Sequence, residues 1–138
     1  MAKRTVKGAD HSKAWNDLEL EAMDAVAMAS EAVAILETQL MVLCDDVAYG
    51  AFDLMKVAHD KADQAFRALR PGATGATDAF EAASCKLAVA ASVLYVVAED
   101  KDQQVLWGVY RLMELARDKV NDVVLRKLAT LERESHHA

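Results

Sequence analysis

The residues with the clearest potential for chemistry stand near the C-terminus, where Glu134 and His137 form a Glu-x-x-His motif. Di-iron and di-manganese helical bundles carry this motif on two helices and a carboxylate on each of two others, because the metals need oxygen and imidazole ligands that converge inside the core. This chain has one such motif, and we expect the segment 135–138 around it to fray. The stripes expected to face the core carry alanine, leucine, valine and methionine instead of carboxylates. We therefore predict no metal site and no cofactor.

A second candidate is His59, because a class of four-helix bundles uses one exposed histidine to accept a phosphoryl group. In that class a lysine and a glycine follow in a His-x-x-Lys-Gly pattern, whereas this chain reads His59-Asp60-Lys61-Ala62. The neighbouring carboxylate would repel a phosphoryl group. We expect His59 to be a partly exposed structural residue.

Nucleophilic catalysis lacks its partners. Ser30, Ser84 and Ser92 fall inside expected helices with no histidine nearby in the sequence, and neither Cys44 nor Cys85 has a histidine within one helical turn to make it a thiolate. Both cysteines have apolar neighbours, where free cysteine behaves as a small hydrophobic residue. We predict no catalytic residues and expect that the protein is not an enzyme.

Composition and charge limit the classes of partner. The chain of 138 residues carries a net charge of -6, which is typical of proteins that do not bind nucleic acid, because binding to phosphates needs a basic face. The longest apolar run, 87–98, is too short to cross a bilayer. With no signal peptide and two cysteines that need not pair, we expect a cytoplasmic protein without a membrane-spanning segment.

The elements that position these residues come from an internal repeat. Residues 50–61 return as residues 108–119, with Gly, Leu, Met, Ala, Asp and Lys at matched positions. Upstream, 40–46 matches 94–100, but 101–104 have no counterpart. Insertions are tolerated best at exposed connections, so we expect residues 101–104 to lie in the turn that joins two helices. The equivalent turn of the first copy is expected near Asp45 and Asp46. Each copy is thus predicted to be a helical hairpin.

Apolar residues recur every three or four positions, and the chain has one proline, Pro71, so the predicted class is all-α. We predict a single domain, a four-helix bundle of two repeated antiparallel hairpins. Its parts are a flexible N-terminus (1–11), hairpin one (12–70), a linker (71–77) and hairpin two (78–134).

Helix boundaries follow from capping residues. Asp46 is the expected cap of the second helix, and Asp78 with Glu81 reads as a capping box at the start of the third. A polar turn is expected over 99–102, with the fourth helix running to Arg133. One alternative stays open: the first two helices could be continuous past Cys44 and bury their apolar stripe by swapping with a second chain.

The third helix has more apolar surface than one bundle needs. Beside its core stripe it carries Val89, Val93 and Val96, whereas Gln39 interrupts the same face of the first helix. Exposed apolar stripes usually mark interfaces, so we predict self-association, as a homodimer, through these three valines. The alternative is that the ends of the first and fourth helices fold over this face.

A small-ligand pocket is the second hypothesis. Tyr49 and Trp107 occupy equivalent positions beside the matched glycines Gly50 and Gly108. Glycine costs about 1 kcal/mol in a helix interior, so the matched pair predicts close approach of backbones. The two aromatic side chains would then wall a pocket between the hairpins.

The segment from Leu106 to Ala116, with its Trp107-Gly108 pair, follows a helix rich in leucine, alanine and valine. In this it resembles small uncharacterised bacterial proteins that consist of one helical hairpin, a domain of unknown function. The resemblance covers about fifty residues and implies a helical hairpin, here duplicated, of bacterial or phage-like origin, with no activity to carry over. The sequence as a whole predicts a nonenzymatic bundle that acts through protein–protein interaction.

Overall fold

The computed structural model describes residues 2–71 and 73–137, and the side chains of 12–71 and 73–134. In these ranges the chain is helical, without a strand, which confirms the all-α class. The first three helices are α1 (Ala2–Leu43), α2 (Asp46–Arg67) and α3 (Ala76–Lys101). The last helical stretch comprises α4 (Gln104–Lys119), a π-helical segment η1 (Val120–Val124) and α5 (Leu125–His137).

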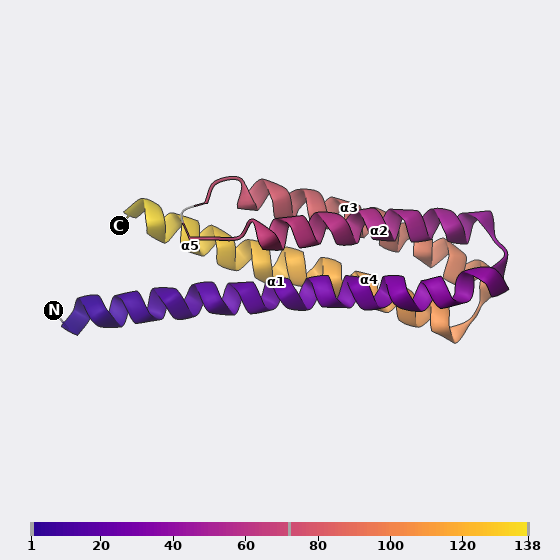
Figure 1. Cartoon of the computed structure of the whole chain (residues 1–138), viewed down its shortest axis with the longest axis horizontal. Coiled ribbons are helices and arrows are strands. Elements are labelled where there is room, and N and C mark those ends of the chain that lie inside the picture. Colours follow the sequence, from indigo (N-terminus) through magenta and orange to yellow (C-terminus); the bar gives the residue numbers. More distant parts are fainter. Residues whose placement is uncertain (1, 72, 138) are drawn as a thin grey trace.

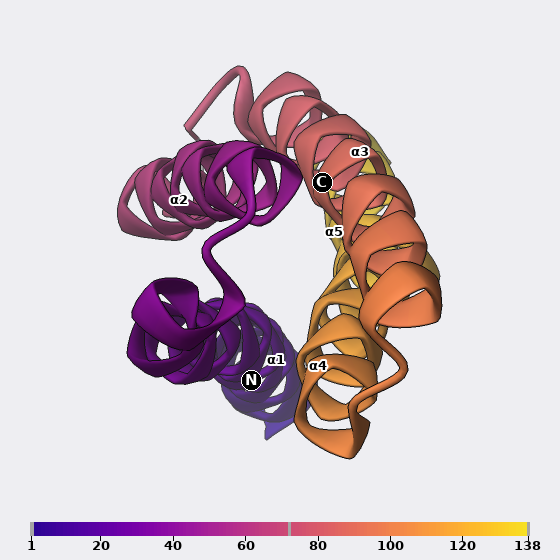
Figure 2. The same cartoon turned by 90° about the vertical axis from the view of Figure 1, so that its right-hand side faces the viewer.

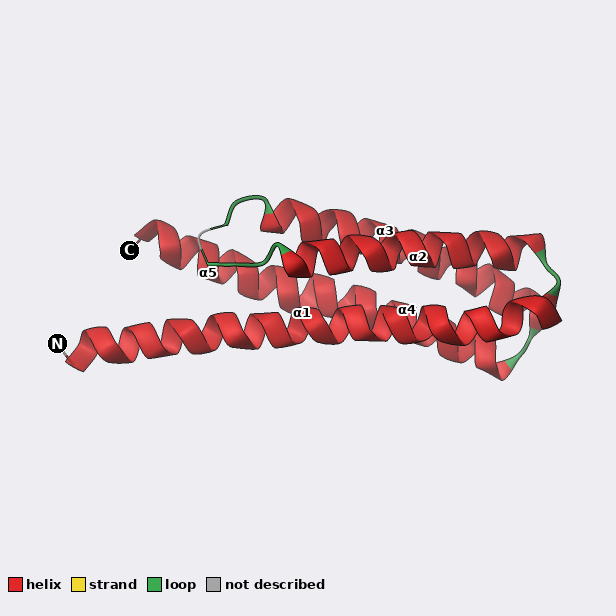
Figure 3. Ribbon diagram, in the orientation of Figure 1, coloured by secondary structure: helices red, strands yellow, loops and turns green. Residues whose placement is uncertain are grey.

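The helices lie side by side along one long axis (Figure 1). α1 contacts α2 and α4, and α3 contacts the same two helices, so α1 and α3 are diagonally opposite, as are α2 and α4 (Figure 2). The turns 44–45 and 102–103 meet at one end, and both ends of the chain lie at the other together with the connection between α2 and α3 (Figures 1 and 3).

The first and last helices are longer than expected. Residues 2–11, which we expected to be a flexible N-terminus, form the start of α1, and the last helix continues to His137 instead of ending at Arg133. Between residues 2 and 43 there is no proline and one glycine, Gly8. Once a helix is nucleated, each added residue gains a backbone hydrogen bond, so an uninterrupted sequence extends it.

Two turns of the same conformation connect α1 to α2 and α3 to α4. Cys44 (φ 48°) and Asp102 (φ 47°) are left-handed, and each donates its backbone N–H to the carbonyl four residues earlier. The next residues, Asp45 and Gln103, are extended. The chain therefore reverses after Leu43, and the alternative of a continuous helix through Cys44 is wrong.

The residues without a counterpart, 101–104, do not lengthen the second turn. Both turns have two residues, 44–45 and 102–103, because α2 starts at Asp46 and α4 starts at Gln104. α3 instead continues four residues past Val97, the residue that matches the end of α1, and Glu99 to Lys101 are helical instead of part of a polar turn. Four residues are about one helical turn, so the insertion extends a helix and leaves the turn unchanged.

The helix caps differ from the expected ones. Asp45, not Asp46, caps α2: its Oδ1 accepts hydrogen bonds from the backbone N–H groups of Val47 (2.7 Å) and Ala48 (3.4 Å). α3 begins at Ala76 after a left-handed Gly75 (φ 86°), so the predicted capping box is wrong. Asp78 still lies in the first turn of α3, where a negative charge interacts favourably with the helix dipole. The connection spans 68–75, three residues earlier at its start than the predicted linker.

The core is rich in small side chains. α2 buries one large residue among alanines, namely Ala48, Ala51, Met55, Ala58, Ala62 and Ala65. The largest fully buried side chain of the described part is Phe80, near the start of α3. Alanine at these positions lets neighbouring helices pack closely without the cost of glycine.

The π-helical segment η1 has a visible cause in the sequence. From Leu106 to Leu131, the buried residues are spaced 3, 4, 3, 4, 4, 4 and 3 apart. Three successive steps of four, from Ala116 to Leu128, would rotate the stripe by about 40° at each step in a regular α-helix. The wider π turn takes up the extra residue and keeps the stripe facing the core. Beside it, Ser84 Oγ donates a hydrogen bond to Asn121 Oδ1 at 2.6 Å.

Candidate interaction surface

Four residues form a continuous strip on the outer side of α3. Val89 is 48% exposed and Val96 is 58% exposed, and they share the strip with the exposed Cys85 and Ser92. Their spacing of four, three and four keeps them on one helical face. We call Cys85, Val89, Ser92 and Val96 the α3 strip.

Of the three valines predicted to form the interface, Val93 lies apart. It is partly buried and packs against the core, because it is rotated about 40° from Val89, towards the bundle. The ends of α1 and α5 do not cover the strip, since Val89 and Val96 stay exposed. Sequence spacing alone does not show on which side of the strip a neighbouring helix begins.

An aromatic cluster lies beside the strip and was not predicted. Tyr95 of α3 packs edge to face on Trp107 (5.4 Å between ring centres) and on Tyr110 (5.5 Å), and these two residues of α4 pack on each other at 6.0 Å. Such pairs add about 0.5–1.5 kcal/mol each beyond the area they bury. The signal in the sequence was the i, i+3 spacing of Trp107 and Tyr110, directly after the turn that follows Tyr95.

The predicted pocket residues do not come together as expected. Tyr49 and Gly50 lie at the start of α2, whereas Trp107 and Gly108 lie at the start of the diagonally opposite α4 (Figure 2). Both glycines are exposed, and a Cβ built on either would meet nothing within 4 Å. The expected close approach of backbones at these glycines is therefore wrong. Trp107 turns to Tyr95 and Tyr110 instead.

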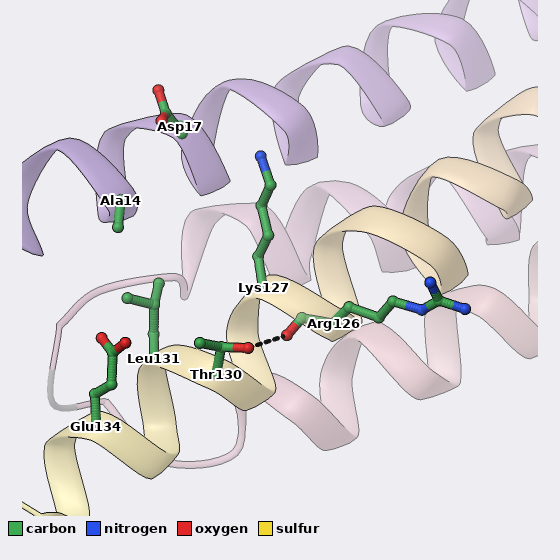
Figure 4. A pocket seen from close by; sticks show the side chains of 7 residues that line it. All are labelled: Ala14, Asp17, Arg126, Lys127, Thr130, Leu131 and Glu134. Carbon is green, nitrogen blue, oxygen red and sulfur yellow. Dashed lines mark hydrogen bonds between the residues drawn. The ribbon is translucent and has the colours of Figure 1, made fainter.

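A groove of about 300 Å³ lies elsewhere, between α1 and α5, near the end of the bundle that holds the chain termini (Figure 4). The Lys127 side chain extends from α5 towards α1, and the Thr130 hydroxyl donates to the Arg126 carbonyl at 3.1 Å. The residues that line it are Ala14, Asp17, Arg126, Lys127, Thr130, Leu131 and Glu134. Its lining mixes acidic, basic and apolar side chains.

The candidates for chemistry stay apart. His59 is partly exposed, as expected, with Nδ1 3.4 Å from the Asp60 carboxylate. Among the residues whose side chains are described, no group of three or more histidine, cysteine or acidic side chains gathers in a way that could hold a metal ion. The side chain of His137, the second member of the Glu-x-x-His motif, lies outside the described residues.

Ion pairs tie α1 to the last helical stretch. Lys119 Nζ lies 2.6 Å from Glu21 Oε2 and 3.4 Å from Asp24 Oδ2, and Lys127 Nζ lies 3.9 Å from Glu21 Oε1. The hydrogen bond from Lys119 holds the pKa of Glu21 below its ordinary value, and the same bond raises the pKa of Lys119. The pairs are partly exposed, so they contribute modestly to stability.

We expect Lys119→Met to lower the free energy of unfolding at pH 7 by about 0.5–1 kcal/mol. The pKa of Glu21 is lower in the folded state than in the unfolded chain, where it is about 4.3. The ion pair therefore contributes fully to stability above the unfolded pKa, and this contribution is lost as the pH falls through the folded pKa. Urea unfolding at pH 7 and pH 3 measures this, and the difference between parent and variant should shrink at pH 3. Lys61→Met, at the exposed equivalent position of the repeat, is the control and should change little. An undiminished difference at pH 3 would contradict the assignment.

Two helices, within 12–43 and 76–101, are long and apolar enough to cross a membrane by length and composition, although core helices of soluble proteins pass the same test. No family profile, no curated protein and no solved structure matches this chain. The resemblance to single-hairpin bacterial proteins stays a prediction.

Proposed function

We propose that this chain is a nonenzymatic helical bundle that acts through protein–protein interaction and associates with itself through the α3 strip. The observation that carries the proposal is the exposure of Val89 and Val96 on one face of a helix whose opposite face is fully buried. If the strips of two copies covered each other, the apolar surface removed from water would stabilise the dimer by about 25 cal/mol for each Å² buried.

The proposal also includes the origin of the fold as two repeated antiparallel hairpins. The two turns have matching left-handed and extended residues at Cys44–Asp45 and Asp102–Gln103, which supports descent from one duplicated unit. In the first copy the residues that match Val89 and Val96 are Ile35, which is partly buried against the core, and Val42, which is 75% exposed, so the first copy exposes one aliphatic residue where the second exposes two.

Val96→Glu tests self-association. We expect the variant to be a monomer in light scattering after gel filtration, while the parent elutes as a dimer, because a buried carboxylate at the contact loses its hydration. Val57→Glu, at an exposed position of α2, is the matched control and should leave the dimer intact. Val93→Glu is unsuitable because Val93 packs against the core and its replacement would unfold the helix pair. An equal mass for the parent and Val96→Glu would refute the interface.

A small-ligand role is the alternative, and the groove between α1 and α5 is the observation that favours it. The cytoplasm is the proposed location. Between residues 14 and 43 α1 carries six acidic side chains, which would be costly inside a bilayer, and the buried face of α3 is used by the bundle.

A further inference from the structure

A second exposed apolar face runs along α1, on the helix diagonally opposite α3. Leu20 is 61% exposed, Met23 is 49% exposed and Met41 is 83% exposed. Between them the same side of the helix carries exposed small residues: Ala27, Ser30 and Ala34. We call these six residues the α1 face.

The α1 face has the spacing of a helix-packing seam. From Leu20 to Ala34 its members are three, four, three and four residues apart, and Met41 follows one heptad after Ala34, with the exposed Glu37 at the step between them. This is the pattern with which one helix packs along another. Small residues in the middle and larger ones at both ends would let a partner helix approach closely at the centre.

Both flanks of the α1 face are acidic. Glu19 and Glu37 lie on one side, and Asp24 and Glu31 lie on the other. The segment 14–43 contains no lysine or arginine at all. Lys119 reaches Asp24 from the bundle, but Glu31 and Glu37 are exposed on the outer surface.

From this combination we infer that the α1 face binds a basic amphipathic helix of another protein. Its apolar stripe would lie on the α1 face and its lysine or arginine residues would pair with Glu19, Glu31 and Glu37. A second copy of α1 would bring acidic flanks against each other, which is unfavourable. Anionic lipid headgroups would be repelled for the same reason. The surface lies away from the α3 strip, so this binding does not depend on the proposed self-association.

The test uses three labelled synthetic peptides in fluorescence anisotropy. The first has leucine at the stripe positions of three heptads and lysine on the flanks. The second replaces lysine by glutamate, and the third has the residues of the first in an order that breaks the stripe. We expect the lysine peptide to bind at least about tenfold more tightly than either of the others, and more weakly as salt screens the flanking charges.

Variants locate the binding. Glu31→Lys with Glu37→Lys should weaken binding of the lysine peptide about tenfold. The control is Asp53→Lys with Asp60→Lys on α2, because it changes net charge equally at exposed positions and should weaken binding much less. Met23→Asn, which leaves the charge unchanged, should also weaken it.

Several outcomes would overturn the inference. One is that the glutamate peptide binds as tightly as the lysine peptide. Another is that the Glu31→Lys/Glu37→Lys and Asp53→Lys/Asp60→Lys variants lose the same amount of affinity for the lysine peptide. The third is that the protein binds anionic vesicles and does not bind the lysine peptide. Val96→Glu separates the two proposals: it should bind the lysine peptide as the parent does even though it is monomeric. A Val96→Glu protein that still dimerises, and loses the dimer on Met23→Asn, would show that a second copy occupies the α1 face.

Discussion

Deleting Asp122 should leave the protein folded and helical, whereas deleting Arg111 from the same helical stretch should unfold it. Asp122 lies in the π-helical segment, where the spacing of buried residues holds one residue more than a regular repeat. Its removal makes the spacing from Leu106 onward 3, 4, 3, 4, 3, 4 and 3, which an unbroken α-helix satisfies. The α5 residues that face the core then keep their direction.

Deleting Arg111 has no such compensation nearby. It would rotate Met113 and Ala116 by about 100° away from the core. Exposing Met113 alone costs about 2–5 kcal/mol, out of a total stability of about 5–15 kcal/mol for a typical domain. Far-UV circular dichroism with urea titration compares the two proteins. If both deletions unfold the chain, η1 does not act as a store for one surplus residue.

The second large effect is expected for Phe80→Ala, which should lower the free energy of unfolding by about 3–5 kcal/mol. Phe80 is 1% exposed and is the largest fully buried side chain of the described residues. Much of the core cluster to which Phe80 belongs consists of alanine, whose short side chains cannot move in to fill the space. The cavity therefore stays open, and its cost adds to the lost transfer of the ring from water.

Phe52→Ala is the matched control for Phe80→Ala. Phe52 is partly buried, and its ring carries Lys56 Nζ 4.7 Å from the centre. We expect a loss of about 1 kcal/mol. Urea denaturation with an unchanged slope should give both values. Similar losses for the two phenylalanines would mean that the core around Phe80 collapses into the void.

The sequence was sufficient for the helical class and for the place of the first turn, because those depend on periodicity and on local capping chemistry. Asp45 and Asp46 are adjacent, and their order decides which one caps, but periodicity does not resolve a single residue. The extra residues 101–104 were assigned to a turn because insertions usually lie in connections. A length of four matches one helical turn, so the chain could absorb them inside α3 without changing its faces.

The surface was harder to predict than the core. Val89 and Val93 are the same residue type and lie only four positions apart on α3. The position of the neighbouring helix decides that Val93 packs against the core and that Val89 is exposed. The paired glycines suggested close packing, yet the space beside Gly50 and Gly108 is open, while alanines make the close contacts of α2. Trp107 had an equivalent partner in Tyr49 by sequence, but in the structure it packs on Tyr95 across the turn and on Tyr110 of its own helix.

The extra helical turn of α3 carries Lys101 to the opposite turn, where its Nζ lies 3.0 Å from Asp45 Oδ2. The proximity lowers the pKa of Asp45, through the Lys101 hydrogen bond first and the cap of α2 second, and raises that of Lys101. No equivalent lysine exists in the first half, because the inserted residues occur once. On the proposed duplication, the two halves are thus no longer interchangeable. The single chain therefore resembles two different subunits that are covalently joined. Each half could acquire a recognition surface that the other half lacks.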